Sequence, residues 1–369
     1  MKSFEQIILE FFSVSDFSFY WYLVFIVGGV LLPGIIVFLL FSINTILAIY
    51  FEQKVSAFMQ DRLGPMEVGI FGFKGGKKFW GGIGQMIADA IKLLSKEDIL
   101  PKDADRKLMV LAPFIIFISA FLTFIGVPLS SHFIISDFNI GVFYILAMSS
   151  VVVIGIILAG WASNNKWSLY GAMRSAAQII SYEIPIGLAI LVPVLIAGSL
   201  HIGDIVDWQE NNRWFIIHSP FAFVAFFIYF ISGVAEANRA PFDIPEAESE
   251  LVAGWMTEYS GFRWSLFFLA EYANMLIISL VAAIVFLGGW LSPLTLINVF
   301  PDSWSYLDGP VWGVFWLIIK AVFLMFVMMW FRWTFPRLRV DQLMYLSWKI
   351  FVPFSLANIV FIAIWEILF

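Results

Sequence analysis

The chain has 369 residues, and 13% of them are charged, about half the charged share of an ordinary soluble domain. Because 61% are apolar, the composition excludes a soluble globular protein and favours one that lies in lipid. The absence of cysteine excludes disulfides, thiolate zinc sites and cysteine-held iron–sulfur clusters on this chain. The net charge of −6 argues against a nucleic-acid-binding protein.

Eight long stretches of the sequence are almost free of charge, and each is long enough for a transmembrane helix of about 20 residues. They predict helices near 20–49, 109–129, 141–161, 180–200, 217–236, 266–289, 311–332 and 349–368. Segments 2–12 and 84–96 place apolar and polar residues on opposite faces, which predicts amphipathic helices at the membrane surface. We therefore expect an all-α integral membrane protein with one domain over residues 1–369.

The basic residues lie mostly on one side of these predicted helices. Segments 50–107, 162–179, 237–265 and 332–349 carry 18 of the 21 lysines and arginines, whereas the opposite side carries only Lys2 and Arg213. By the positive-inside rule, these four segments are predicted to be cytoplasmic loops of an inner (plasma) membrane protein, with both termini outside. The basic residues of 332–349 are expected to fix the orientation of the protein in the membrane. The alternative is that they contact an anionic lipid or a partner protein.

No metal site is predicted. The three histidines, His132, His201 and His218, have no partner at the spacing of helical metal ligands, and we expect them to be solvated loop residues.

The loop 237–265 is rich in acids. Pro245 suits the first position of a helix, and three glutamates follow it within five residues. One or two acids would satisfy a helix N-terminus, whereas closely spaced like charges raise each other's pKa and favour proton sharing. We therefore predict proton-relay roles for Glu246, Glu248, Glu250 and Glu258.

Four ionisable side chains lie inside or at the ends of predicted membrane helices: Glu183, Glu236, Glu271 and Lys320. Such residues are costly in lipid and indicate function. The predicted orientation places the three glutamates in the cytoplasmic half, where they are expected to meet beneath the acidic loop and relay protons. The alternative is that each side chain extends separately to the lipid headgroups. Lys320 is either a further proton relay or a counter-ion, and the sequence favours neither role.

Long motifs in the loops resemble those of the membrane H-subunit family of NADH:quinone oxidoreductase, respiratory complex I. The main one is EANRAPFDIPEAESELVAGWMTEYSGFRWSLFFLAEY at 236–272, and others are EQKVSAFMQDRLGP at 52–65, ADAIKLLSKEDILP at 88–101, GWASNNKWSLYGAMRSAAQIISYEIP at 160–185 and RLRVDQLMYLSWK at 337–349. The resemblance implies a subunit that lines a quinone chamber and couples quinone reduction to proton translocation. It also implies that NADH, FMN and iron–sulfur clusters are bound by partner subunits, and that this chain alone binds no cofactor.

The resemblance assigns roles to individual residues. It implies that Glu183, Glu236 and Glu271 link the chamber to the proton pathway through the loop acids. The residues that it places at or near the quinone cavity are Arg62, Asp89, Arg239, Asp243 and Phe268. Gln53 and Met66-Glu67 depart from the family's usual Arg and Asn-Arg. The resemblance therefore does not determine which side chains form the quinone entrance.

Other functions compatible with the sequence are a homologous subunit of a membrane-bound hydrogenase-type complex, a stand-alone proton-coupled transporter and a passive docking anchor. The sequence leaves the choice between ubiquinone and menaquinone open.

Overall fold

A computed structural model describes residues 26–69, 81–245, 248–293 and 309–368. The predicted amphipathic segment 2–12, residues 20–25 of the helix predicted at 20–49, and Glu246 lie outside these ranges. Within them the regular elements are helices, which agrees with the predicted all-α membrane fold.

Each of the eight predicted membrane helices is found. The bounds are α3 (Leu32–Met59, preceded by a π-helical turn over Ile26–Leu31), α5 (Arg106–Ile125), α6 (Gly141–Ala162), α7 (Lys166–Ala197), α10 (Pro220–Glu236), α12 (Gly261–Phe286), α13 (Pro310–Thr334), and α14 (Val340–Tyr345), which continues through the π-helical segment Leu346–Phe351 into α15 (Val352–Leu368). Seven of these helical stretches are long and apolar enough to cross a membrane, and α10, with 17 residues, is a shorter apolar helix.

Two helices extend well beyond their charge-free runs. Helix α3 continues to Met59 although residues from 50 onward are predicted as loop, and α7 begins at Lys166 instead of near residue 180. The start of α7 is fixed by Asn165, whose side chain accepts a hydrogen bond from the backbone N–H of Trp167 at 2.9 Å. A charge-free run therefore locates the lipid-facing part of a helix, whereas local capping and protein contacts determine its ends.

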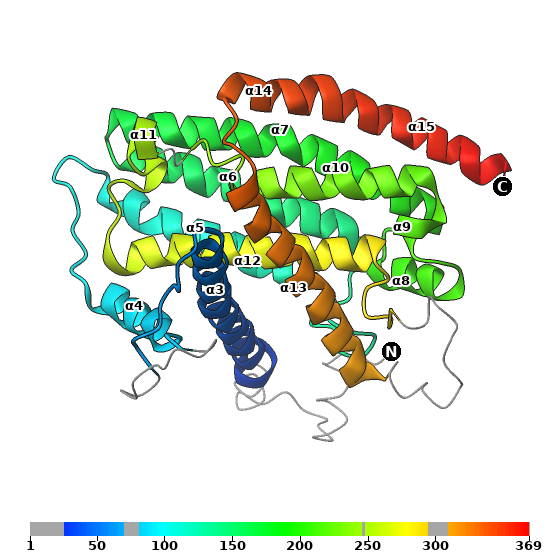
Figure 1. Ribbon diagram of the computed structural model, residues 1–369, viewed down its shortest axis with the longest axis horizontal. Helices are drawn as coiled ribbons and strands as arrows, with labels where there is room; N and C mark the ends of the chain where they lie inside the picture. Colours follow the sequence, from blue (N-terminus) through cyan, green and yellow to red (C-terminus); the bar gives the residue numbers. More distant parts are fainter. Residues whose placement is uncertain (1–25, 70–80, 246–247, 294–308, 369) are drawn as a thin grey trace.

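Helix α12 is the centre of the bundle and is the most buried of the spanning helices. It packs on α3, α5, α10 and α13. Figure 1 shows α7, α10 and α12 running side by side, with α15 along α7 and α10, while α3 and α13 cross α12 at a steep angle. The close approach of α10 to α12 requires Gly233, because a Cβ there would lie 2.5 Å from Cγ2 of Ile278.

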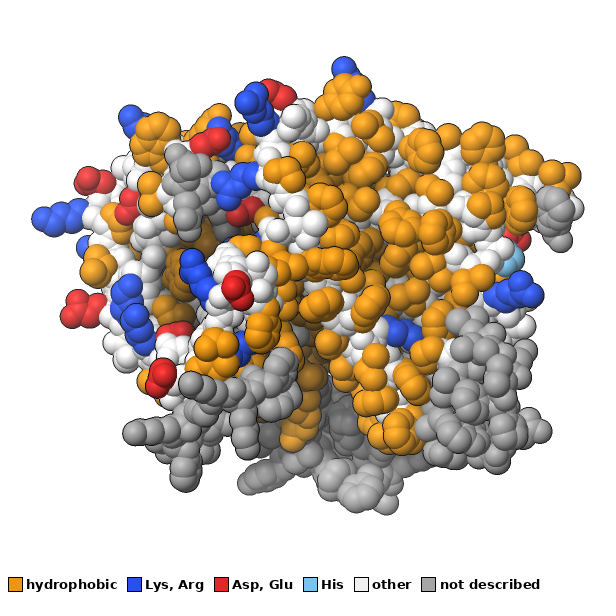
Figure 2. Space-filling model, in the orientation of Figure 1, with side chains coloured by type: hydrophobic (Ala, Val, Ile, Leu, Met, Phe, Trp, Pro, Cys, Tyr) orange, Lys and Arg blue, Asp and Glu red, His pale blue; other side chains and the backbone are white. Residues whose placement is uncertain are grey.

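Short helices lie at the two ends of the bundle. At one end are α4 (Gly84–Ser95), α11 (Glu248–Leu251) and a 3₁₀ turn (Gly254–Met256), and at the other are α8 (Ile202–Asn211) and α9 (Phe215–His218). Helix α4 confirms the helix predicted at 84–96. Figure 2 shows charged side chains gathered over the α4–α11 end and hydrophobic side chains across the middle of the molecule.

Candidate functional site

A buried ion cluster joins α3, α12, α13 and the loop after α10. Nη1 of Arg239 lies 3.1 Å from both carboxylate oxygens of Glu52, and its Nε lies 2.8 Å from Oε1 of Glu271. The Tyr272 hydroxyl donates to Glu52 at 2.6 Å, and Arg332 also pairs with Glu52. Both Glu52 and Arg239 are only 6% exposed. Burial opposes the charge of Arg239, but Glu271 and Glu52 raise its pKa above the usual value, so it stays a cation.

The local fold directs Arg239 into this cluster. Asn238 adopts a left-handed φ of 52°, which turns the chain sharply at the end of α10. The amide of Gln178 on α7 donates to the carbonyls of Ala235 and Phe242, at 2.8 and 2.9 Å, and so fixes both sides of the turn. Arg239 lies between these two anchored carbonyls and is held toward α3 and α12.

A large cavity of about 460 Å³ lies between α3, α4 and α12. Its lining includes Gln53, Asp89, Tyr259, Trp264 and Phe268. The rings of Trp264 and Phe268 lie 4.2 Å apart, and Asp89 accepts a hydrogen bond from Gln85 at 3.0 Å. The volume and the aromatic rings are typical of a site for a small organic molecule, and the charged side chains of Asp89, Lys92 and Lys96 also line it.

The five residues that the family resemblance assigned to a quinone cavity are distributed over several places. Asp89 and Phe268 line the large cavity, and Arg239 is in the ion cluster. Asp243 pairs with Arg337 at 3.0 Å, and burial raises its pKa although Arg337 and Arg332 lie near. Arg62 is exposed in the loop that follows α3 and does not line the cavity.

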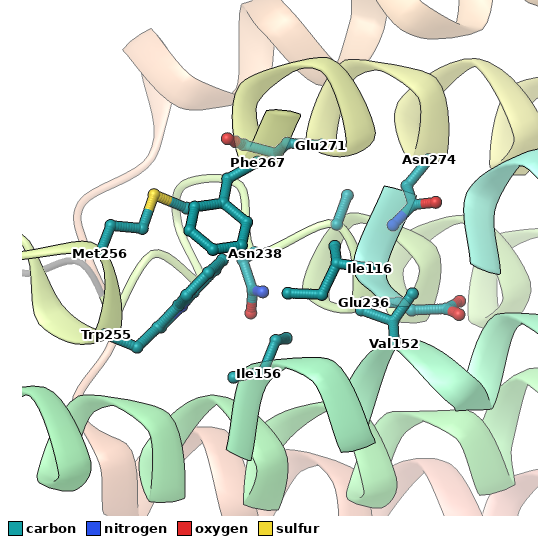
Figure 3. Close-up of a pocket in the computed structure, with 11 residues that line it drawn as sticks. Ile116, Val152, Ile156, Glu236, Asn238, Trp255, Met256, Phe267, Glu271 and Asn274 are labelled. Atoms are coloured by element: carbon teal, nitrogen blue, oxygen red, sulfur yellow. The ribbon is translucent and has the colours of Figure 1, made fainter. Parts of the chain in front are cut away.

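A second, small cavity of about 30 Å³ lies between Glu236 and Glu271. Figure 3 shows the two carboxylates on opposite sides of the cavity and directed away from each other, and Asn238 and Asn274 also line it. Glu236 is also close enough to Glu183 to interact electrostatically. The three predicted intramembrane glutamates thus follow one another in space, from Glu271 across the small cavity to Glu236 and on to Glu183.

The loop acids lie elsewhere. Glu250 pairs with Arg174 of α7 at 2.6 Å, and this hydrogen bond lowers the pKa of Glu250. Glu258 accepts a hydrogen bond from Asn165 at 2.7 Å. Neither lines the cavity between Glu236 and Glu271. Glu246 lies outside the described residues, and the side chain of Glu248 is not among those described.

Sequence reasoning missed Glu52 and its partner Arg332 as site residues. Glu52 directly follows a charge-free run, and a charge there normally marks the end of a membrane helix. The available signal was Lys54, a second ionisable residue close by, which is only 2% exposed and donates to the carbonyls of Leu63 and Pro65 at 3.2 and 2.7 Å. A helix that buries two charged residues so close together packs against protein at that point.

Lys320 is anchored to backbone. Its ammonium donates to the carbonyls of Leu287, Gly289 and Leu291, at 2.7, 2.9 and 2.7 Å. Its Nζ also lies 4.1 Å from the ring centroid of Trp214. Among the described residues no carboxylate pairs with Lys320. Its three N–H donors therefore all stabilise the turn that follows α12.

Two of the three histidines pair with acids instead of being free in solvent. His201 lies 2.6 Å from Asp137 and 3.1 Å from Asp204, and His218 lies 2.9 Å from Glu366. In the described part of the chain no group of three histidine, aspartate or glutamate residues could hold a metal ion.

Comparison with known proteins identifies the family. The family model described as NADH dehydrogenase matches residues 32–363. The NADH-quinone oxidoreductase H subunit of Chlorobaculum tepidum is 50% identical over 359 residues, covering 96% of each chain. The corresponding H subunits of Chlorobaculum parvum and Bacteroides thetaiotaomicron are 53% and 49% identical, over 86% and 89% of this chain and 87% and 88% of theirs. With its helical membrane fold and buried ion cluster, the chain therefore belongs to the NADH dehydrogenase family, alongside the H subunits of NADH-quinone oxidoreductases.

Proposed function

We propose that this chain is the membrane subunit of a proton-pumping NADH:quinone oxidoreductase that lines the quinone chamber and couples quinone reduction to proton translocation. In this role it is part of an enzyme complex whose other subunits bind NADH, FMN and iron–sulfur clusters. The chain's own side chains support this division, because a protein without cysteine offers no thiolates for an iron–sulfur cluster.

One observation carries the proposal: neighbouring side chains lead from the large cavity to the ion cluster and on toward the intramembrane glutamates. Phe268 lines the large cavity, and its ring centroid lies 6.2 Å from that of Tyr272, whose hydroxyl donates to Glu52. Glu52 shares Arg239 with Glu271. Glu271 in turn lines the small cavity together with Glu236, which lies near Glu183. A charge change in the large cavity therefore has a short route to acids within the membrane.

The large cavity suits a quinone head. Its aromatic side chains offer stacking faces, while Asp89 and Gln53 offer hydrogen-bonding groups. Reduction of a quinone adds electrons and takes up protons, so the charge of the cavity changes during turnover. Charge interactions are strong where the dielectric is low, and buried carboxylates respond by binding or releasing protons.

Arg239 is the group through which we expect this response to pass. Arg239 is a single cation shared by the carboxylates of Glu52 and Glu271. When one carboxylate gains a proton, the interaction of Arg239 with the other carboxylate becomes stronger. Protons would then move along Glu271, Glu236 and Glu183 and influence neighbouring membrane subunits. Moving one charge across the membrane costs ~2.3 kcal/mol per 100 mV, so each movement has to be driven by the redox reaction.

The proposed orientation places the α4–α11 end in the cytoplasm of a bacterial cell, with the termini outside the inner membrane. It is supported by the 18 basic residues in the four segments that connect helices on one side. The partners at this end would be the quinone-site subunits of the peripheral arm, and the lipids of the bilayer would surround the apolar helices.

The test is the substitution of Glu271→Gln and Glu236→Gln in the intact complex, with Glu210→Gln of the exposed end of α8 as the matched control. In proteoliposomes we expect assembled complexes whose proton-coupled quinone reduction falls by roughly tenfold or more, because removal of a positioned proton-transfer group is costly. Wild-type quinone reduction and wild-type acidification in both variants would refute the proposal. A preparation lacking an NADH-oxidising flavin subunit would instead favour the hydrogenase-type alternative.

A further inference from the structure

We propose that Ser149 and Ser150, two neighbouring serines of α6, are positioning residues that hold the carboxyl groups of Glu236 and Glu183 and allow the two acids to share one proton. This inference rests on the proposed function, because it concerns two of the same glutamates. Apart from the two serines, only Tyr144 and Trp161 of α6 have a side chain with an O–H or N–H donor. The two hydroxyls are therefore exceptional in a helix that is otherwise almost entirely apolar.

Each serine contacts a different glutamate. The side chain of Ser149 forms a hydrogen bond with Glu236 at the end of α10, and that of Ser150 forms one with Glu183 of α7. Figure 3 shows the carboxylate of Glu236 directed away from Glu271. Glu236 and Glu183 interact electrostatically, and α7 packs on both α6 and α10. The two serines therefore lie beside a pair of acids that respond to each other's charge.

Each hydroxyl also has an acceptor within its own helix. Oγ of Ser149 lies 3.0 Å from the carbonyl oxygen of Leu146, and Oγ of Ser150 lies 2.9 Å from that of Ala147. A serine hydroxyl has one hydrogen to donate and two lone pairs that accept, and it rotates to suit its partners. It can therefore direct its hydrogen either to the helix carbonyl or to the carboxylate.

The protonation of each glutamate decides between these two directions. An ionised carboxylate can only accept, so the serine beside it donates to it. A protonated carboxyl group donates its own O–H, so the serine accepts that bond and turns its hydrogen to the helix carbonyl. When the proton is on Glu183, Ser149 donates to ionised Glu236 and Ser150 accepts from Glu183. When the proton is on Glu236, the two serines exchange these roles.

The two arrangements contain the same number and the same kinds of hydrogen bonds, which keeps them close in energy. Two neighbouring carboxylates repel each other when both are ionised, so the pair favours holding one proton. A hydroxyl that donates to whichever acid is ionised offsets the cost of burying that charge. In the transfer, one O–H bond breaks at the acid that gives the proton and one forms at the acid that receives it. Both serines keep their own hydrogen and only turn.

The backbone around this site is fixed. On α6, the hydroxyl of Ser119 donates to the carbonyl of Met148 at 2.6 Å, which attaches the turn before the serines to α5. On α7, Pro185 has no N–H for the carbonyl of Ser181, and the hydroxyl of Ser347 donates to that carbonyl at 2.5 Å instead. The hydroxyls can therefore turn while the helices that carry them and their acids stay in place.

The experiment compares alanine and threonine at each serine, in the intact complex in proteoliposomes. Alanine favours a helix at least as well as serine, so these variants are expected to fold, and threonine keeps the hydroxyl. We expect Ser149→Ala and Ser150→Ala each to slow proton-coupled quinone reduction roughly tenfold, the effect of one hydrogen bond to a charged group, and to alter its pH profile. The threonine variants are expected to stay within about threefold of wild type.

Ser355→Ala is the control for the loss of a helical serine. Ser355 of α15 likewise donates to a carbonyl of its own helical turn, that of Phe351, at 2.7 Å. In the described part of the chain it has no carboxylate partner, so its replacement is expected to leave turnover at the wild-type rate.

The double variant Ser149→Ala/Ser150→Ala distinguishes a balanced pair from two separate contacts. Removing both hydroxyls withdraws a donor from both acids and restores the balance between them. We therefore expect the double variant to be no slower than the slower single variant. Independent effects would multiply to roughly a hundredfold, and that result would overturn the proposal.

Two other results would also overturn it. Wild-type turnover in both alanine variants would show that the hydroxyls have no role in proton transfer. Threonine variants as slow as the alanine variants would show that the hydroxyl is not the group that matters. Failure of the proposed function is separate, because it would appear as normal turnover in Glu271→Gln and Glu236→Gln.

Discussion

Replacing Lys320 by methionine distinguishes a structural anchor from a proton carrier. Methionine keeps most of the chain length and removes the ammonium, which would leave the carbonyls of Leu287, Gly289 and Leu291 without their donor. An unpaired buried carbonyl costs about 1–3 kcal/mol. Three of them give a loss of about 3 kcal/mol at the lower limit, before any relief from no longer burying a charge.

The assay is thermal and denaturant unfolding of the purified complex in detergent, followed together with proton pumping. We expect Lys320→Met to unfold several degrees earlier and to keep its ratio of protons to electrons at temperatures where it is folded. Lys166→Met is the control, since Lys166 is exposed and its ammonium lies over the ring of Trp167. Unchanged stability with abolished pumping would refute the reasoning and make Lys320 a relay.

Two further substitutions test other contacts. Glu52→Gln leaves Arg239 and Arg332 without their shared carboxylate, and we expect a loss of about 3–5 kcal/mol in stability, measured by thermal unfolding against the exposed Glu67→Gln. An equal effect of the two variants would contradict a buried cluster. For His201, burial opposes protonation, but Asp137 and Asp204 raise its pKa above the usual 6.5. A raised pKa in the folded state stabilises the protein at low pH, and this contribution is lost as the pH rises through the raised value. His201→Asn should therefore destabilise the protein more at about pH 6 than at about pH 9, and a difference independent of pH would argue against the ion pairs.

The helical spans could be predicted because lipid imposes a requirement that is readable along the chain: about 20 residues without charge. Glu183, Glu236 and Glu271 could be predicted for the same reason, since each interrupts or borders such a run. The helix ends could not, because they depend on contacts such as the cap at Asn165 and on protein that covers Glu52.

The partners of the buried charges were beyond sequence reasoning. Glu52 and Arg239 are 187 residues apart, and Glu52 and Arg332 are 280 apart, so only the packing of α3 on α12 and α13 reveals the cluster. The loop acids illustrate the reverse, since their proximity in sequence does not bring Glu250 and Glu258 into the same cavity as Glu236.

The position of Arg239 has a mechanical consequence. Its rigid guanidinium reaches Glu52 on α3 with one nitrogen and Glu271 on α12 with another. These two helices also form facing walls of the large cavity, through Gln53 on one side and Phe268 on the other. The span of a single side chain therefore limits how far those walls can separate, and a guest that forces them wider must detach one carboxylate from its cation.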